Sequence, residues 1–137
     1  MDVIGVAFCG AQMREVVISA GTVSVRARLL DTPTAARIWA ALPIQAAAQT
    51  WGAEVYFQTD VSSDREPNAR ELIRAGEIAF WPDGDAIAIG FGPTPISRTK
   101  GEIRLASPCN VWAEALDDVK QFKCVHAGET ICVMAAD

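Results

Sequence analysis

The segment from Gly76 to Pro95 constrains the fold most, because it is typical of one β-hairpin that leaves its sheet through a proline-rich exit. Large and small side chains alternate along its second strand: Ile87, Ile89 and Phe91 against Ala86, Ala88 and Gly90. Since successive side chains of a strand point to opposite faces, one face carries bulk and the other is almost bare. A second surface must approach the bare face closely. A packed helix, another part of the chain or a ligand would each meet this need.

Size and composition predict one globular domain. The chain has 137 residues, of which 50% are apolar and 21% are charged, which is enough to build a core without cross-links. Its net charge is -5, and its arginines are scattered, so no basic stripe is present to bind phosphates or anionic lipid. We therefore expect neither a nucleic-acid nor a membrane partner. The oligomeric state stays open.

The N-terminal residues are expected to stand apart from the domain. Residues 3–13 are apolar, but no basic residue precedes them, and Gly5, Gly10 and Gln12 interrupt the run. This pattern favours a loose or edge-strand segment over a signal peptide. We place a poorly defined segment at 1–15 and a single domain at 16–137.

The cysteines and the histidine do not form a recognisable metal or catalytic motif. The chain has four cysteines, with no Cys-x-x-Cys pair, and one histidine: Cys9, Cys109, Cys124, Cys132 and His126. We expect free thiols in a reducing cytoplasm, with no metal and no cofactor. His126 is expected to be a surface or turn residue, because a pair with Cys124 would need an activated thiolate and a cleft.

Short strands dominate the expected secondary structure. Besides the hairpin, strands are expected at 16–19, 23–29, 44–50, 54–59, 109–116 and 130–135. A helix is expected between Pro33 and Pro43, and a short one after Asp117 or Asp118. Polar loops are expected at 60–70 and 96–105, with a helical turn at 69–75. Such a pattern of roughly eight strands suggests a closed barrel, because closure removes exposed sheet edges.

The chain has no nucleophile elbow, P-loop, dinucleotide-binding fingerprint or His-Glu-x-x-His motif. Glu54 is the most interesting carboxylate, because it begins an aromatic strand. Alternation places Glu54 and Tyr56 on one face and Val55 and Phe57 on the other. If Val55 and Phe57 fill a barrel, Glu54 and Tyr56 point outward or into a groove. The alternative is that Glu54 and Tyr56 lie on a solvent-exposed edge.

Several segments together resemble one protein family. They are residues 21–39, 51–57, 76–82, 90–95, 110–112 and 128–129. These segments are similar to those of a family of small, mostly uncharacterised prokaryotic proteins with a minimal cyclophilin-like barrel. The resemblance covers roughly residues 16–135. It implies a mainly β fold: a closed barrel of roughly eight strands, with one capping helix and one short C-terminal helix.

The resemblance makes standard prolyl isomerase chemistry doubtful. Cyclophilins with that activity carry an arginine on the strand after the first helix, but residues 44–50 contain none. Arg37 or Arg98 could substitute only from other elements. Without that cation, much of the electrostatic assistance to the reaction is missing.

We therefore expect a domain that binds a small molecule or peptide in an aromatic groove. The expected groove residues are four aromatic side chains and two polar anchors: Trp51, Tyr56, Trp81, Phe91, Glu54 and Thr94. Trp81 and Phe91 could instead be barrel core. A weak peptidyl-prolyl isomerase is the alternative function, and an enzyme acting on a small carboxylated or amide metabolite is a third. Within the hairpin, function is expected at its aromatic ends rather than along the bare strand.

Overall fold

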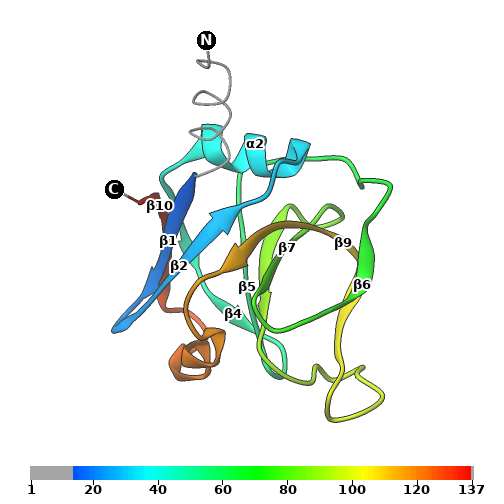
Figure 1. Ribbon diagram of the computed structural model, residues 1–137. Coiled ribbons are helices and arrows are strands. Elements are labelled where there is room, and N and C mark those ends of the chain that lie inside the picture. The colour runs from blue at the N-terminus through cyan, green and yellow to red at the C-terminus, as the bar shows by residue number, and fades with distance from the viewer. Residues whose placement is uncertain (1–13, 137) are drawn as a thin grey trace.

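A computed structural model describes residues 14–136, which form ten strands and two helices (Figure 1). The elements in chain order are β1 (Glu15–Ala20), β2 (Val23–Leu29), α2 (Pro33–Ala41), β3 (Ile44–Ala47), β4 (Gln49–Thr50), β5 (Glu54–Gln58), β6 (Arg70–Ile73), β7 (Glu77–Trp81), β8 (Ala86–Gly90), β9 (Ile103–Ala115), η1 (Val119–Cys124) and β10 (Thr130–Ala135). Nearly all of the segment expected at 1–15 lies outside the described residues, and β1 begins at Glu15.

The strands form a nearly closed antiparallel barrel. Their order is β3-β10-β1-β2-β9-β7-β8-β5-β4, with β6 paired to β9 outside this path. The two ends of the path, β3 and β4, are separated in sequence only by Ala48. The Ala48 backbone nitrogen donates to the Glu129 carbonyl over 2.8 Å, and the Gly128 nitrogen donates to the Ala48 carbonyl over 2.7 Å. The mainly β barrel expected from the sequence is confirmed, with ten strands in place of roughly eight.

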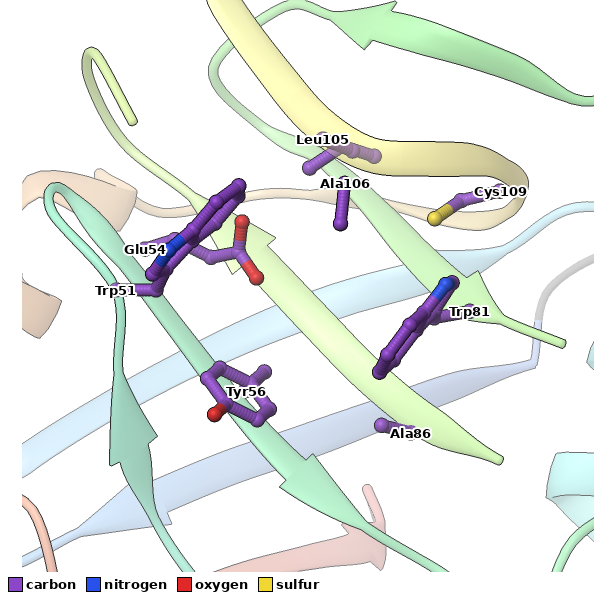
Figure 2. A pocket seen from close by; sticks show the side chains of 8 residues that line it. All are labelled: Trp51, Glu54, Tyr56, Trp81, Ala86, Leu105, Ala106 and Cys109. Carbon is purple, nitrogen blue, oxygen red and sulfur yellow. The ribbon is translucent and has the colours of Figure 1, made fainter. Parts of the chain in front are cut away.

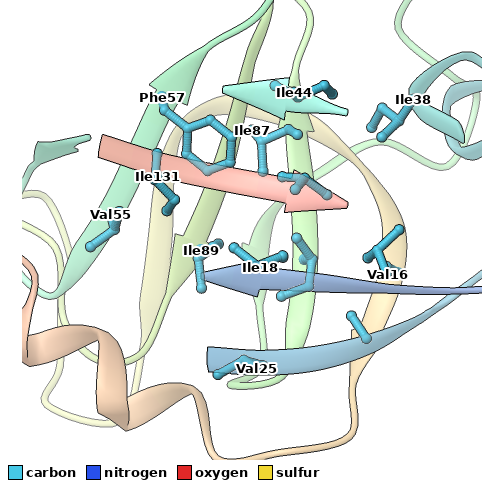
Figure 3. Close-up of a cluster of buried hydrophobic side chains, with 14 of the residues drawn as sticks. Val16, Ile18, Val25, Ile38, Ile44, Val55, Phe57, Ile87, Ile89 and Ile131 are labelled. Atoms are coloured by element: carbon cyan, nitrogen blue, oxygen red, sulfur yellow. The ribbon is translucent and has the colours of Figure 1, made fainter. Parts of the chain in front are cut away.

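Alternating apolar side chains fill the barrel (Figure 3). In β5, Val55 and Phe57 point into this core, as expected, and in β8 Ile87 and Ile89 do the same. Both helices add to it. The buried residues that they contribute are Ala35 and Ile38 from α2, and Val119 and Phe122 from η1. Helix α2 begins where expected, with the Thr32 side chain accepting from the Ala35 backbone nitrogen.

Two local predictions were wrong. Residues 70–73 form strand β6 where a helical turn was expected, and β9 begins at Ile103, inside the expected polar loop, rather than at Cys109. The two segments pair with each other, for example Ile73 with Ile103. Each segment is short and carries charged residues, so neither has a clear strand pattern alone. Their pairing overrides the local preference.

This second pair of strands covers part of the bare face of β8. Ala79, Ala88 and Cys109 lie in a small second cluster with Ile73, Ile103 and Leu105. A Cβ atom added to Gly90 would come within 2.5 Å of Ile103 Cγ2, so only glycine permits this approach. Another part of the chain, β6 with the first part of β9, is therefore the surface that meets Ala88 and Gly90.

An ion pair between the buried Glu77 carboxyl and the partly exposed Arg70 side chain links β6 to β7 and provides a test of the fold. Arg70 donates from Nη1 to Glu77 Oε1 over 2.9 Å and from Nη2 to Oε2 over 2.8 Å, and the Arg74 backbone nitrogen donates to Oε1 over 2.7 Å. The hydrogen bonds from Arg70 are the largest cause that lowers the pKa of the Glu77 carboxyl. Glu77 is 8% exposed, so it depends on these partners.

We expect Arg70→Met to lower the free energy of unfolding at pH 7 by about 1–2 kcal/mol, because it leaves a buried carboxylate without its bidentate partner. The value is modest because the Arg70 side chain is 44% exposed. Arg74→Met is the matched control: its side chain is 87% exposed and lies 3.7 Å from Glu77, so we expect a loss below about 0.5 kcal/mol. Denaturant unfolding measures both variants. Equal losses in free energy of unfolding would contradict the assignment of Arg70 as the main partner of Glu77.

Candidate functional site

A cavity of about 160 Å³ lies on the outer face of the barrel, where β5, β7 and β8 meet the first part of β9 (Figure 2). We call it the aromatic pocket. Eight residues line it: Trp51, Glu54, Tyr56, Trp81, Ala86, Leu105, Ala106 and Cys109. Figure 2 shows the Trp51 and Trp81 rings on opposite sides, with the Glu54 carboxyl group directed into the space between them.

Strand register explains why a pocket forms here. On the outer face, Tyr56 lies opposite Ala88, and Glu54 opposite Gly90. On the other side of β8, Trp81 lies opposite Ala86. The central strand therefore presents small residues, while both neighbours present large ones, which creates a trough. β6 and the first part of β9 pack against Ala88 and Gly90, and the space that remains between β9, Ala86 and the large side chains is the pocket.

The Trp81 ring is held in place by polar and steric contacts. Its Nε1 donates to Ser107 Oγ over 2.7 Å, and the Ser107 hydroxyl donates to Asp83 Oδ2 over 3.2 Å. A Cβ atom on Gly84 would approach the indole to 2.4 Å, so the ring lies directly against the glycine of the hairpin turn. One wall of the pocket is thus rigid before any ligand arrives.

Glu54 is the main polar group of the pocket. The residue is 6% exposed, and its Oε1 atom is buried without a hydrogen-bond partner among the described residues. Burial raises the pKa of the Glu54 carboxyl to about 7, because the charged form is poorly solvated there. The alternative of a solvated edge is therefore wrong for Glu54, and Tyr56 beside it is half-buried.

The Glu54 backbone also shapes the pocket. Its carbonyl accepts a hydrogen bond from the Trp51 nitrogen over 3.0 Å, which closes the turn before β5. This turn brings the Trp51 ring to the same side of the sheet as the Glu54 carboxyl group (Figure 2). A carboxyl group that is neutral or charged near pH 7 can donate or accept a hydrogen bond or take up a proton.

Cys109 brings a thiol to the pocket, but a neutral one. Its Sγ donates to the Ser107 carbonyl over 3.3 Å, and burial raises the pKa of the thiol to about 12. Because the thiolate is the nucleophilic form, Cys109 is an apolar lining residue and not a candidate nucleophile. Sequence reasoning missed Cys109, Leu105 and Ala106 as pocket residues. The signal that could have indicated them was the bare face of β8, which required an approaching segment.

Four of the six residues expected to form the groove lie together in the pocket, and Phe91 and Thr94 do not. Phe91 is half-buried and packs against the main core, as the alternative for it had proposed. Thr94 is 5% exposed, and its hydroxyl donates to the Arg104 carbonyl, so it stabilises the loop after β8. Of the two aromatic ends of the hairpin, Trp81 lines the pocket and Phe91 does not, and Ala86 of the bare strand lines it as well.

In the described part of the chain, the other cysteines and the histidine considered from the sequence do not line the aromatic pocket. Cys124 and His126 are both exposed at the end of η1. Cys109, Cys124 and Cys132 are free thiols, while Cys9 lies outside the described residues. Within residues 14–136, no group of three or more metal-ligating side chains comes together. No helix in that same range is long and apolar enough to cross a membrane.

Comparisons with known proteins agree with the barrel. The family model described as cyclophilin-like matches residues 14–134. The solution structure of the hypothetical protein AF2241 from Archaeoglobus fulgidus is similar, with a TM-score of 0.79 and 34% sequence identity. That match covers 91% of this chain and 96% of AF2241. No curated protein matches the sequence. The likeness to a hypothetical protein concerns the fold and brings no activity with it.

Proposed function

Because this chain belongs to the cyclophilin-like family, whose fold by itself does not define an activity, we propose that it is a binding domain that holds a small molecule or a peptide side chain in the aromatic pocket. The observation that carries this proposal is the buried Oε1 atom of Glu54, which has no hydrogen-bond partner among residues 14–136. Buried polar atoms nearly always have hydrogen-bond partners, and leaving one without a partner costs about 1–3 kcal/mol. A ligand that supplies the missing partner accounts for this cost.

The shape and lining of the pocket support the proposal. A volume of about 160 Å³ is close to that of cavities of about 150 Å³ that hold a benzene ring. Rings of Trp51, Tyr56 and Trp81 with one polar group are the usual composition of a ligand site. An adjoining groove of about 480 Å³ shares Tyr56, Trp81 and Ala86 with the pocket, and it leaves room for the rest of a larger ligand.

The isomerase alternative has no specific observation in its favour. Among the described residues, no arginine lines the pocket. The charged side chain of the pocket is the Glu54 carboxyl. Arg37, which donates to the Ser62 carbonyl over 3.4 Å, and Arg98 both lie outside the pocket lining. The donor that would stabilise a twisted prolyl amide therefore has no counterpart here.

We expect Ala106→Trp to weaken ligand binding strongly, because Ala106 is exposed at the pocket and an indole there would fill the space. The probes are single-ring compounds: benzyl alcohol, benzylamine and benzoate. Nuclear magnetic resonance titration of the wild type should show shifts of the Trp51 and Trp81 indole N–H signals for at least one probe. The dissociation constant should rise more than about tenfold in the variant, which corresponds to about 1.4 kcal/mol.

Ala36→Trp is the control, because Ala36 is exposed on α2 and does not line the pocket. It adds the same side chain and should leave binding unchanged. Failure of every probe to shift the two indole signals, or equal affinity in wild type and Ala106→Trp, would refute the proposal.

A further inference from the structure

We propose that the aromatic pocket selects an organic cation, in which a protonated amine, amidine or guanidine group on a compact apolar body pairs with the Glu54 carboxylate. This inference rests on the proposed binding function and names the ligand class. It concerns one ion pair and the aromatic walls around it.

The charges that line the pocket favour a cation over an anion. Glu54 is the acidic member of the lining, and the lining contains no lysine, arginine or histidine among the described residues. An anion would meet an unpaired carboxylate without a compensating donor. A cationic N–H group would satisfy the buried Oε1 atom and cancel the charge whose burial is unfavourable.

No nearby basic side chain is available to take the place of a ligand cation within the described region. On β9, Arg104 pairs with Glu102 over 2.7 Å and with Glu71 over 3.1 Å. Beside Trp81, Arg65 pairs with Asp83 over 3.6 Å. The other titratable groups that line the pocket are the Tyr56 hydroxyl and the Cys109 thiol, which are not cationic. Among the described residues these arginines have carboxylate partners outside the pocket, and none of them lines it beside Glu54.

The aromatic walls fit the same ligand class. The faces of tryptophan and tyrosine rings attract cations, and planar guanidinium or amidinium groups also stack on them. Trp51 and Trp81 stand on opposite sides of the space into which the Glu54 carboxyl group points (Figure 2). A flat cation between the two rings could therefore contact an aromatic face and the carboxylate together.

The raised pKa of Glu54 couples this binding to pH. The folded protein holds a neutral carboxyl below about pH 7 and a carboxylate above it, and only the carboxylate forms the ion pair. Cation affinity should therefore rise with pH and level off above about 7. With a pKa of about 7, affinity at pH 5.5 should be about 30-fold weaker than at pH 8.5, and binding at the lower pH should release a proton.

The test compares benzamidine, a flat cation, with benzamide and benzoate, its neutral and anionic counterparts. Calorimetric titration of the wild type at pH 8.5 should give at least tenfold tighter binding of benzamidine than of either counterpart. Glu54→Gln should remove this preference and the pH dependence. Glu114→Gln removes the same charge from an exposed position that does not line the pocket, so it should retain both. Nuclear magnetic resonance spectra of each variant establish that it remains folded.

The outcomes separate this inference from the proposed function. If benzamidine and benzamide bind with equal affinity, and both affinities are lost in Ala106→Trp, the cation preference is overturned. The proposed binding function of the pocket then still holds. A cation preference that persists in Glu54→Gln would assign it to surface charge and overturn the inference. If no compound binds, both the inference and the proposed function are overturned.

Discussion

Glu54→Gln is expected to gain about 2–3 kcal/mol in free energy of unfolding relative to the wild type as the pH rises from 5 to 8. The reason is the pKa of the Glu54 carboxyl, which burial raises from 4.5 to about 7. Between these two values the folded wild type binds a proton that the unfolded chain has already released. Wild-type stability from this group is therefore present below pH 4.5, is lost as pH rises toward 7, and changes little above it.

Glutamine has nearly the same shape and no proton to lose in this range, so the variant lacks this dependence. Denaturant unfolding of both proteins at pH 5, 6, 7 and 8 measures the difference directly. All other ionisable groups are the same in both proteins, so their contributions largely cancel in the comparison. Glu114→Gln should run parallel to the wild type, because Glu114 is exposed. Parallel curves for Glu54→Gln would mean that the buried carboxyl is not a source of strain at neutral pH.

This result would bear on function as well as stability. A variant that is more stable at pH 8 but no longer binds a cation would show that the chain retains an unfavourable buried charge for the sake of its ligand. Such exchange of stability for activity is common at binding sites. A more stable variant with unchanged binding would instead assign Glu54 no part in the ligand's recognition.

Asn110→Ala is expected to lower the free energy of unfolding by about 3–4 kcal/mol, through lost hydrogen bonds and a small cavity. Asn110 is 1% exposed and joins three segments. Its Nδ2 donates to Thr34 Oγ1 over 3.0 Å and to the Asp64 carbonyl over 2.9 Å, and its Oδ1 accepts from the Glu66 nitrogen over 2.9 Å. One side chain thus ties the loop before β6 and the start of α2 to β9.

Two further variants test whether the loss of stability comes from the hydrogen bonds of Asn110 or from the removal of any polar side chain. Asn68→Ala removes the same side chain from an exposed position of the same loop, so we expect a change within about 0.5 kcal/mol. Asn110→Asp retains the shape but replaces both N–H donors with an acceptor, and it should be nearly as destabilising as alanine at pH 7. Denaturant unfolding measures the free energy of unfolding of all three variants. A small effect of Asn110→Ala would show that the loop is held by other contacts.

Local patterns were sufficient for much of the barrel and part of the pocket. The strand at 23–29 and the closing strand at 130–135 occur as the sequence predicted, because clear alternation or strong apolar character reports which face is buried. The same alternation placed Val55 and Phe57 in the core, with Glu54 and Tyr56 on the opposite face. Trp51 lies just before β5 and Trp81 ends β7, and both strands pair with β8, so the two rings line the same pocket.

The errors share one physical cause. Strand β6 and the start of β9 have weak local patterns and are stabilised by pairing with each other across about thirty residues of sequence. Phe91 and Thr94 follow the end of β8, where the chain leaves the sheet, so strand alternation no longer reports the direction of their side chains. Both kinds of position depend on contacts between distant segments.

The sequence by itself therefore determined the barrel class and the two faces of the Gly76–Pro95 hairpin, since these depend on periodicity along one strand. Only the tertiary structure decided what meets the bare face. β6 and the first part of β9 pack against Ala88 and Gly90, and three residues of β9 line the aromatic pocket together with Ala86. The tertiary structure also decided that Glu54 Oε1 is buried without a hydrogen-bond partner among the described residues, because burial and hydrogen bonding depend on which distant groups come within reach.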